Sequence, residues 1–84
     1  MITREDYYER AREFAKSYEE EPTPHIIGIM ASVMMARDNF MMGGSFVECV
    51  VNNDLYGAIN RADTECLKYL RLIVVTKRNC YLNN

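Results

Sequence analysis

Residues 43–63, GGSFVECVVNNDLYGAINRAD, hold the residue types that are best suited to ligand chemistry in this chain. Glycine lets the backbone approach a ligand closely, and serine is a residue type that often begins a helix. The N–H groups at a helix N-terminus favour negative charge, and an arginine adds several directed donors for phosphate or carboxylate. The segment therefore predicts a site for a small anion at a boundary between protomers, built from Gly44, Ser45, Phe46, Asn53 and Arg61.

The same segment has a second interpretation, in which its polar residues only begin and end short helices. Ser45, Asp54 and Asp63 are three possible N-caps at intervals of nine residues. Each would accept hydrogen bonds from backbone N–H groups that the first helical turn leaves unpaired. Glu48, three residues after Ser45, completes the pattern of a capping box. The segment matches no phosphate-loop motif, so capping and ligand binding both stay open.

Catalytic and metal-binding patterns are missing from the sequence. The single histidine, His25, follows Pro24 in the first turn of an expected helix, where an exposed or capping role is usual. The three cysteines have the spacing of neither a disulfide framework nor a zinc site, and reduced thiols fit them best. A Cys-His pair would need His25 beside Cys49 or Cys66, which both lie in apolar helical stretches typical of structural thiols. We therefore expect no enzyme, no catalytic or metal site and no cofactor.

The composition indicates one small globular domain, residues 1–84, that is neither a membrane protein nor a general nucleic-acid binder. The net charge is −2, whereas nucleic-acid binders usually carry a basic domain or stripe. Charge is unevenly placed, with four basic and seven acidic groups in residues 1–21 and five basic and two acidic groups in residues 61–84. The longest apolar stretch, residues 26–36, is far shorter than the roughly 20 residues that span a bilayer.

Helix start and stop signals divide the chain into a compact all-α bundle of four to five helices, two of them short. Thr3 precedes two acidic residues and begins a first helix that buries Tyr7, Ala11 and Phe14. Prolines stop this helix and begin the next, and glycines end the second. The expected helices span residues 4–20, 24–39, 45–52, 55–61 and 64–78.

Apolar residues wrap most of the circumference of the second expected helix. Such a helix is buried on several sides, either at the centre of the bundle or in an oligomer interface. Apolar residues make up 49% of this short chain, which favours a homo-oligomer. Methionine is common at adaptable interfaces, and Met30, Met34 and Met35 are the expected interface residues.

The order GSF, NDL and RAD resembles a widespread family of small bacteriophage proteins. Those proteins carry a P-G-S/G-F element, then V-L-x-N-D-L, then G/A-A-x-x-R-A-D and a closing helix. The matching positions are Gly44, Ser45, Phe46, Val50, Asn53, Asp54, Leu55, Ala58, Arg61, Ala62 and Asp63. The C-terminal residues NCYLNN depart from the Pro- or Gly-containing tail of the family. The resemblance implies a phage protein in the cytoplasm of a bacterial host and implies no activity.

Two functions without catalysis follow from these expectations, both typical of phage accessory proteins that act against host defence. In the first, a homo-oligomer sequesters a small anionic signal, such as a cyclic nucleotide, at helix N-termini and arginines. In the second, the protein blocks a host protein through its methionine-rich helix or its acidic first helix. The expected partners are therefore another copy of the chain and either a small anion or a host protein.

Overall fold

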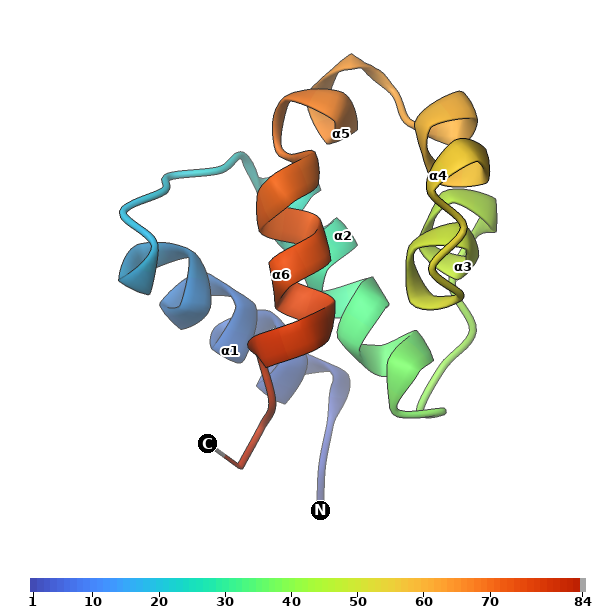
Figure 1. Cartoon of the computed structure of the whole chain (residues 1–84). Helices are drawn as coiled ribbons and strands as arrows, with labels where there is room; N and C mark the ends of the chain where they lie inside the picture. Colours follow the sequence, from blue (N-terminus) through green and yellow to red (C-terminus); the bar gives the residue numbers. More distant parts are fainter. Residues whose placement is uncertain (84) are drawn as a thin grey trace.

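The computed structural model describes residues 1–83 of the 84-residue chain, and this part contains helices and no strand (Figure 1). The six helices in this range are α1 (Arg4–Ser17), α2 (Pro24–Arg37), α3 (Ser45–Val51), α4 (Leu55–Arg61), α5 (Thr64–Lys68) and α6 (Leu70–Asn79). The all-α prediction is confirmed, with six helices instead of four to five. The assembly of several copies stays a prediction.

Local capping explains where the first two helices begin. Thr3 caps α1 in a capping box, because its Oγ1 accepts from the Asp6 N–H at 3.4 Å and the Asp6 Oδ2 accepts from the Thr3 N–H at 2.7 Å. Thr23 caps α2 without a capping box, because its Oγ1 accepts from the Ile26 N–H at 3.4 Å and Ile26 has no side-chain acceptor to return, and Pro24 occupies the first position of the helix. Helix α1 ends at Ser17, before the expected end at residue 20, and Glu19 then adopts a left-handed backbone with φ 57°.

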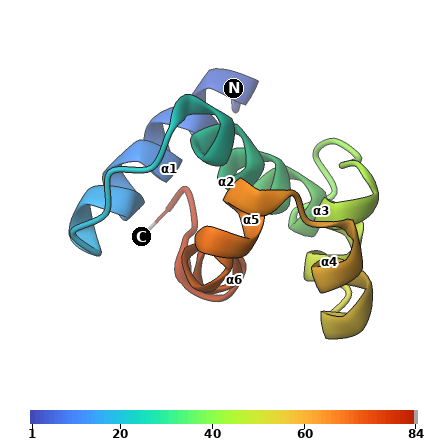
Figure 2. The ribbon, with the colours of Figure 1, turned by 90° about the horizontal axis from the view of Figure 1, so that it is seen from above.

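Helix α2 lies at the centre of the molecule, with α1, α3 and α6 packed around it (Figure 2). Its buried side chains come from nearly its whole circumference and are Ile26, Ile27, Met30, Ala31, Val33, Met34 and Met35. The prediction of a helix buried on several sides is confirmed. Within residues 1–83 no helix, α2 included, is both long and apolar enough to cross a membrane.

The three methionines predicted to form an interface are buried inside the single chain. Met30 and Met34 have no exposed surface, and Met35 is 2% exposed. Contacts with neighbouring helices of the same chain therefore account for the apolar circumference of α2. In this conformation the three side chains offer no surface to a second copy.

Helices α2 and α3 also end one or two residues before the expected positions, and two further features of the expected helices differ from the structure. The expected helix 64–78 is divided at Tyr69, whose φ of −105° and ψ of 19° end α5 and begin α6. No glycine or proline marks this break, so the sequence offers no local signal for it. The predicted N-cap Ser45 is instead the first residue of α3, and Gly44 is the N-cap. The Glu48 carboxylate accepts from the Gly43 N–H at 3.3 Å and therefore does not close a capping box at Ser45.

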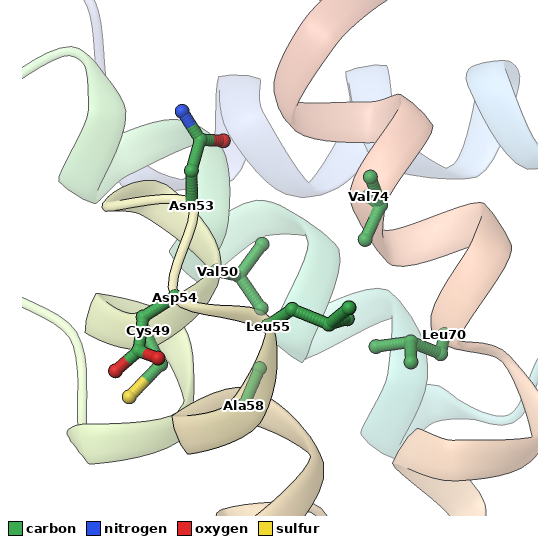
Figure 3. Close-up of a pocket in the computed structure, with 8 residues that line it drawn as sticks. All are labelled: Cys49, Val50, Asn53, Asp54, Leu55, Ala58, Leu70 and Val74. Atoms are coloured by element: carbon green, nitrogen blue, oxygen red, sulfur yellow. The ribbon is translucent and has the colours of Figure 1, made fainter.

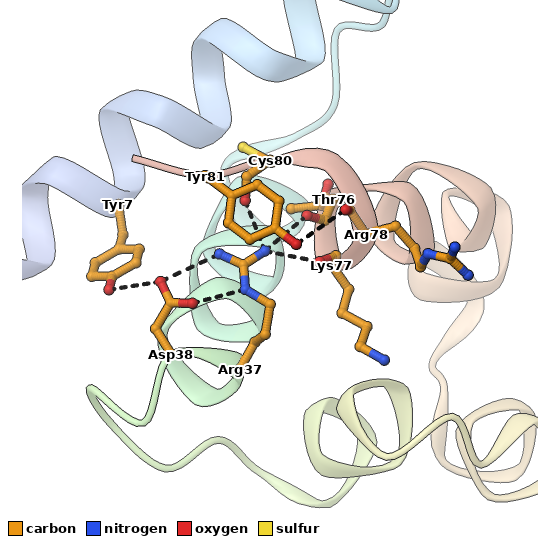
Figure 4. A network of polar contacts seen from close by, with 8 residues as sticks. All are labelled: Tyr7, Arg37, Asp38, Thr76, Lys77, Arg78, Cys80 and Tyr81. Atoms are coloured by element: carbon orange, nitrogen blue, oxygen red, sulfur yellow. Dashed lines mark hydrogen bonds and ion pairs between the residues drawn. The ribbon is translucent and has the colours of Figure 1, made fainter. Parts of the chain in front are cut away.

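A partly buried arginine, Arg37, joins the ends of α2 and α6 (Figure 4). The Arg37 Nη1 donates to the carbonyl oxygens of Thr76, Lys77 and Cys80 at 3.3, 2.8 and 2.7 Å. These carbonyls belong to the last turn of α6 and the residue after it, where a helix leaves acceptors unpaired and favours positive charge. Arg37 thus closes the C-terminus of a helix that begins 33 residues later in the chain.

Two neighbours hold Arg37 in place. Asp38 accepts from Arg37 Nε at 2.8 Å, and its Oδ2 also accepts from the Tyr7 hydroxyl at 3.0 Å. The Tyr81 ring lies 4.2 Å from the guanidinium carbon, within the range of a cation–π contact. Burial, with the hydrogen bond to Asp38, raises the pKa of Tyr7. The hydroxyl therefore stays protonated, and α1 is tied to the same network.

Candidate functional site

The five residues of the predicted anion site have different structural environments. Phe46 belongs to the hydrophobic core and is 8% exposed. Asn53 has a left-handed backbone with φ 61°, and its Oδ1 accepts from Lys77 Nζ at 2.8 Å. The Arg61 Nη1 donates to the Gly57 carbonyl at 3.4 Å and lies 3.8 Å from the Cys49 sulfur. Gly44 and Ser45 form the start of α3. The binding of one anion by all five stays a prediction.

Asn53 and Asp54 border a small cleft between the α3–α4 pair and α6 (Figure 3). Its other lining residues are Cys49, Val50, Leu55, Ala58, Leu70 and Val74. The cleft has a volume of about 160 Å³, below the roughly 300 Å³ of typical small-molecule sites. Most of this lining is apolar and would leave a phosphate without donors, so the cleft does not suit an anion.

The segment around this cleft is organised by two aspartate caps, as predicted. Asp54 Oδ1 accepts from the Gly57 N–H at 3.0 Å, and Asp63 Oδ1 accepts from the Cys66 N–H at 2.7 Å. The hydrogen bond from the Cys66 backbone, with a contact from His25, lowers the pKa of Asp63 below its usual value of 3.8. A lowered carboxyl pKa stabilises the fold at neutral pH, and this contribution is lost as the pH falls below that value.

The cap at Asp54 is tested by a pair of substitutions. Asp54→Ala should lower the free energy of unfolding by about 1 kcal/mol, because the Gly57 N–H loses its acceptor. Asp54→Ser should be nearly neutral, because serine is an equally good cap. Urea denaturation of both variants measures the difference. A serine variant that is stable but inactive in infected cells would show that Asp54 also contacts a ligand or partner.

A larger cleft lies between α1, the segment that follows it and the start of α2. Its volume is about 390 Å³, within the range of sites that hold small organic ligands. Tyr8, Arg12 and Lys16 lie on one face of α1, because residues four apart are neighbours on a helix surface. The remaining lining residues are Ala15 on α1, Glu20, Glu21 and Pro22 in the connection, and Pro24 and Ile27 on α2.

Contacts from both sides orient the Tyr8 ring at this cleft. The ring lies beside Gly28 on α2, where a Cβ would meet the Tyr8 hydroxyl at an ordinary contact distance of 3.6 Å. Arg4 Nη2 donates to this hydroxyl at 3.2 Å, and its guanidinium carbon lies 5.4 Å from the ring centre. The ring is therefore a positioned flat surface on which an aromatic ligand could stack.

The cations of this cleft are available to a ligand. Within residues 1–83, neither Arg12 nor Lys16 forms a salt bridge or a side-chain hydrogen bond. Glu20 and Glu21 also line the cleft, and their carboxylates can accept from N–H or O–H groups. The cleft thus combines an aromatic ring and two free cations with acceptors, a set that suits an anion with a polar aromatic ring.

The sequence patterns do not predict this cleft. They place the apolar stripe of α1 in the core, which is correct for Tyr7, Ala11 and Phe14. The sequence feature that points to the cleft is the spacing of Tyr8, Arg12 and Lys16. This aromatic residue and two cations lie four residues apart and therefore share one face of the helix. The spacing alone is also typical of a solvated face, and only the packing of the 18–23 connection and α2 makes a cleft of it.

Comparisons of this chain with protein families, with curated proteins and with solved structures found no match. The resemblance to small phage proteins therefore stays a prediction. The geometry of the cleft between α1 and α2 is the strongest guide to function in the described residues.

Proposed function

We propose that the protein binds a small anionic ligand of the nucleotide type in the cleft between α1 and α2 and sequesters it without chemical change. The observation that carries the proposal is the presence, around one 390 Å³ cleft, of the Tyr8 ring and the unpaired cations of Arg12 and Lys16. A role as a sponge for a cyclic-nucleotide signal, in a homo-oligomer of phage origin, is the biological setting that we propose.

Each part of such a ligand has a counterpart in the cleft. A base stacks on the Tyr8 ring, an interaction worth about 1–3 kcal/mol per base in proteins that bind single strands. Phosphates pair with Arg12, whose planar group donates two parallel hydrogen bonds, and with Lys16. Glu20 or Glu21 accepts from a base N–H or a ribose hydroxyl. The carboxylates would repel additional phosphates, which favours ligands that carry few charges together with a base.

Sequestration is proposed instead of turnover because of the side chains in the cleft. Its lining residues include no cysteine, serine or histidine, and the two carboxylates of Glu20 and Glu21 are assigned to hydrogen bonds with the ligand. A stacked base and paired phosphates are sufficient for tight holding. The ligand should therefore be recovered chemically unchanged after the protein is denatured.

Calorimetry with linear and cyclic nucleotides tests the proposal. The wild type should bind at least one nucleotide with a Kd below about 100 μM, equivalent to roughly −5.5 kcal/mol. Tyr8→Ala and Arg12→Gln should each raise the Kd at least tenfold, which is a loss of about 1.4 kcal/mol. Arg61→Gln is the matched control, because it removes one arginine from the site predicted at α3 and α4 and leaves the cleft intact.

The possible results distinguish an error in the location of the site from an error in the proposed function. If Arg61→Gln abolishes binding and Arg12→Gln does not, the anion binds at α3 and α4 and the cleft assignment is wrong. If the wild type binds no nucleotide of the panel below about 100 μM, the sponge proposal fails. If the nucleotide is recovered as a hydrolysed product, the protein is an enzyme.

A second candidate function, the blocking of a host protein, rests on the exposed apolar side chains of α4. Leu55, Tyr56 and Ile59 are 66%, 78% and 45% exposed on this short helix. Exposed apolar groups in one area favour protein docking. The methionines of α2 are buried, so α4 and not α2 carries the docking surface in this alternative. Under this alternative, Tyr56→Glu should abolish biological activity in infected cells while Arg12→Gln retains it.

A further inference from the structure

Three side chains that can bind metals meet where the start of α2 lies against the start of α5. His25 Nε2 lies 2.9 Å from Asp63 Oδ2, and the ligand atoms of His25, Asp63 and Cys66 all lie within 4.8 Å of one another. The histidine is 38 residues from the aspartate in the chain, so the fold and not the local sequence brings them together. This group shares no lining residue with the cleft proposed to bind a nucleotide.

The second carboxylate oxygen of Asp63 can act as a ligand if it exchanges its contact with His25 Nε2 for one with an ion. Asp63 uses Oδ1 to cap the Cys66 N–H, and its Oδ2 faces the histidine. The capping hydrogen bond holds the Asp63 carboxylate in place, and Cys66 lies three residues later in α5. The first turn of α5 therefore positions two of the three ligands, Asp63 and Cys66. His25 is held by the first turn of α2, after Pro24. A site on well-defined backbone elements needs only small side-chain movements to close on an ion.

The depth of the three groups also suits an ion that enters from solvent. Cys66 is buried at 3% exposure, whereas the side chains of His25 and Asp63 are 47% and 56% exposed. Burial, with the hydrogen bond to Asp63, raises the pKa of the Cys66 thiol to about 11. The thiol is therefore protonated at neutral pH until a cation displaces its proton.

We propose that His25, Asp63 and Cys66 form a binding site for a thiophilic divalent transition-metal ion of the zinc class. Thiolate, imidazole and carboxylate are the ligand types of protein zinc sites, at about 2.0–2.3 Å from the ion. Ligand atoms around a tetrahedral ion lie roughly 3.3–3.6 Å apart, so separations of up to 4.8 Å need to shorten by up to about 1.5 Å. Three protein ligands leave the fourth position for water or an external ligand.

Binding the ion exchanges protons in a defined way. The Cys66 sulfur loses its proton to solvent and binds as thiolate. The hydrogen bond between His25 Nε2 and Asp63 Oδ2 breaks, Nε2 gives up its proton, and the neutral ring binds through Nε2 with its one proton on Nδ1. Asp63 binds through Oδ2 and keeps its Oδ1 hydrogen bond to the Cys66 N–H. The helix N-termini at α2 and α5 disfavour a cation, but the thiolate and carboxylate together bring two negative charges, which match the charge of the ion.

Titration of the reduced, chelator-free protein with Co²⁺, followed by optical absorption, tests the site. The wild type should develop a thiolate-to-cobalt charge-transfer band and the visible bands of a four-coordinate ion, saturating at one ion per chain. An excess of Zn²⁺ should remove both. Cys66→Ser should abolish the charge-transfer band, and His25→Gln should raise the Kd for Co²⁺ at least tenfold.

Asp63→Asn is the variant that separates metal binding from folding. Asparagine is as good an N-cap as aspartate, so α5 should form as before, and circular dichroism should be unchanged. The Kd for Co²⁺ should nevertheless rise at least tenfold, because the carboxylate charge is lost. Cys49→Ser and Cys80→Ser are the matched thiol controls and should bind as the wild type does. The proposal is overturned if the wild type shows no charge-transfer band at 1 mM Co²⁺ (a concentration about ten times that of the protein), or if the band survives Cys66→Ser.

Discussion

Replacing Arg37 by methionine should lower the free energy of unfolding by about 3 kcal/mol. Methionine keeps much of the length of the side chain but donates no hydrogen bond. The carbonyl oxygens of Thr76, Lys77 and Cys80 then lose their shared donor, and Asp38 loses its cation. Hydrogen bonds to charged groups contribute roughly 1.5–3 kcal/mol each, and the ion pair with the partly exposed Asp38 adds about 1 kcal/mol at most. The Arg37 side chain is 12% exposed, so solvent replaces these partners poorly.

Arg37→Lys is the control for charge alone. The lysine ammonium keeps the positive charge but lacks the planar fork that reaches the carbonyls and Asp38 together. We expect it to recover only part of the loss in a guanidinium denaturation series. If methionine and lysine both leave the unfolding midpoint unchanged, the network contributes nothing to stability. If only the denaturant dependence of the unfolding free energy changes, the substitution acts on the compactness of the unfolded chain.

Met34→Glu should abolish folding at neutral pH, with a cost of more than about 4 kcal/mol. Met34 has no exposed surface and lies in the core, so the variant either buries a carboxylate or displaces the helix. A small domain has a total stability of only about 5–15 kcal/mol. Met34→Leu conserves the volume of the side chain and should cost less than about 1.5 kcal/mol.

Circular dichroism and sedimentation velocity distinguish this expectation from the interface prediction. If methionines of α2 joined two copies, Met34→Glu would yield a folded monomer with native helicity. The packing within one chain instead predicts loss of helicity together with aggregation. A soluble, helical monomer of the glutamate variant would show that α2 contacts another copy.

The sequence predicts the parts of the fold that short-range interactions determine. Asp54 and Asp63 each cap a helix, and α4 has the predicted bounds of 55 and 61. These signals work because an N-cap and its N–H partner lie within three residues of each other. The same reasoning fails at Ser45, where Glu48 bonds to the more distant Gly43 N–H. Gly44 and Ser45 are both possible N-caps for α3, and the residue types alone do not decide between them.

The features that the sequence does not predict depend on contacts between distant residues. The break at Tyr69 lets α5 place Cys66 beside His25 while α6 packs on α2, and no residue type there signals it. The apolar surplus of α2 is explained by three neighbouring helices, so it is weak evidence for an oligomer. The cleft beside Tyr8 likewise requires the connection between α1 and α2 to fold over one face of α1.

The hydrogen bonds between Arg37 and the end of α6 have a consequence for folding during synthesis, because they join an early segment of the chain to a late one. Helix α2 leaves the ribosome well before residues 76–80, whose carbonyl oxygens are the acceptors for its guanidinium. Until those residues emerge, Arg37 at the end of α2 lacks its carbonyl acceptors, and the apolar face of α2 that packs on α6 stays exposed. We expect the nascent chain to stay loosely structured and open to chaperones until then, and to complete its tertiary structure in one late step.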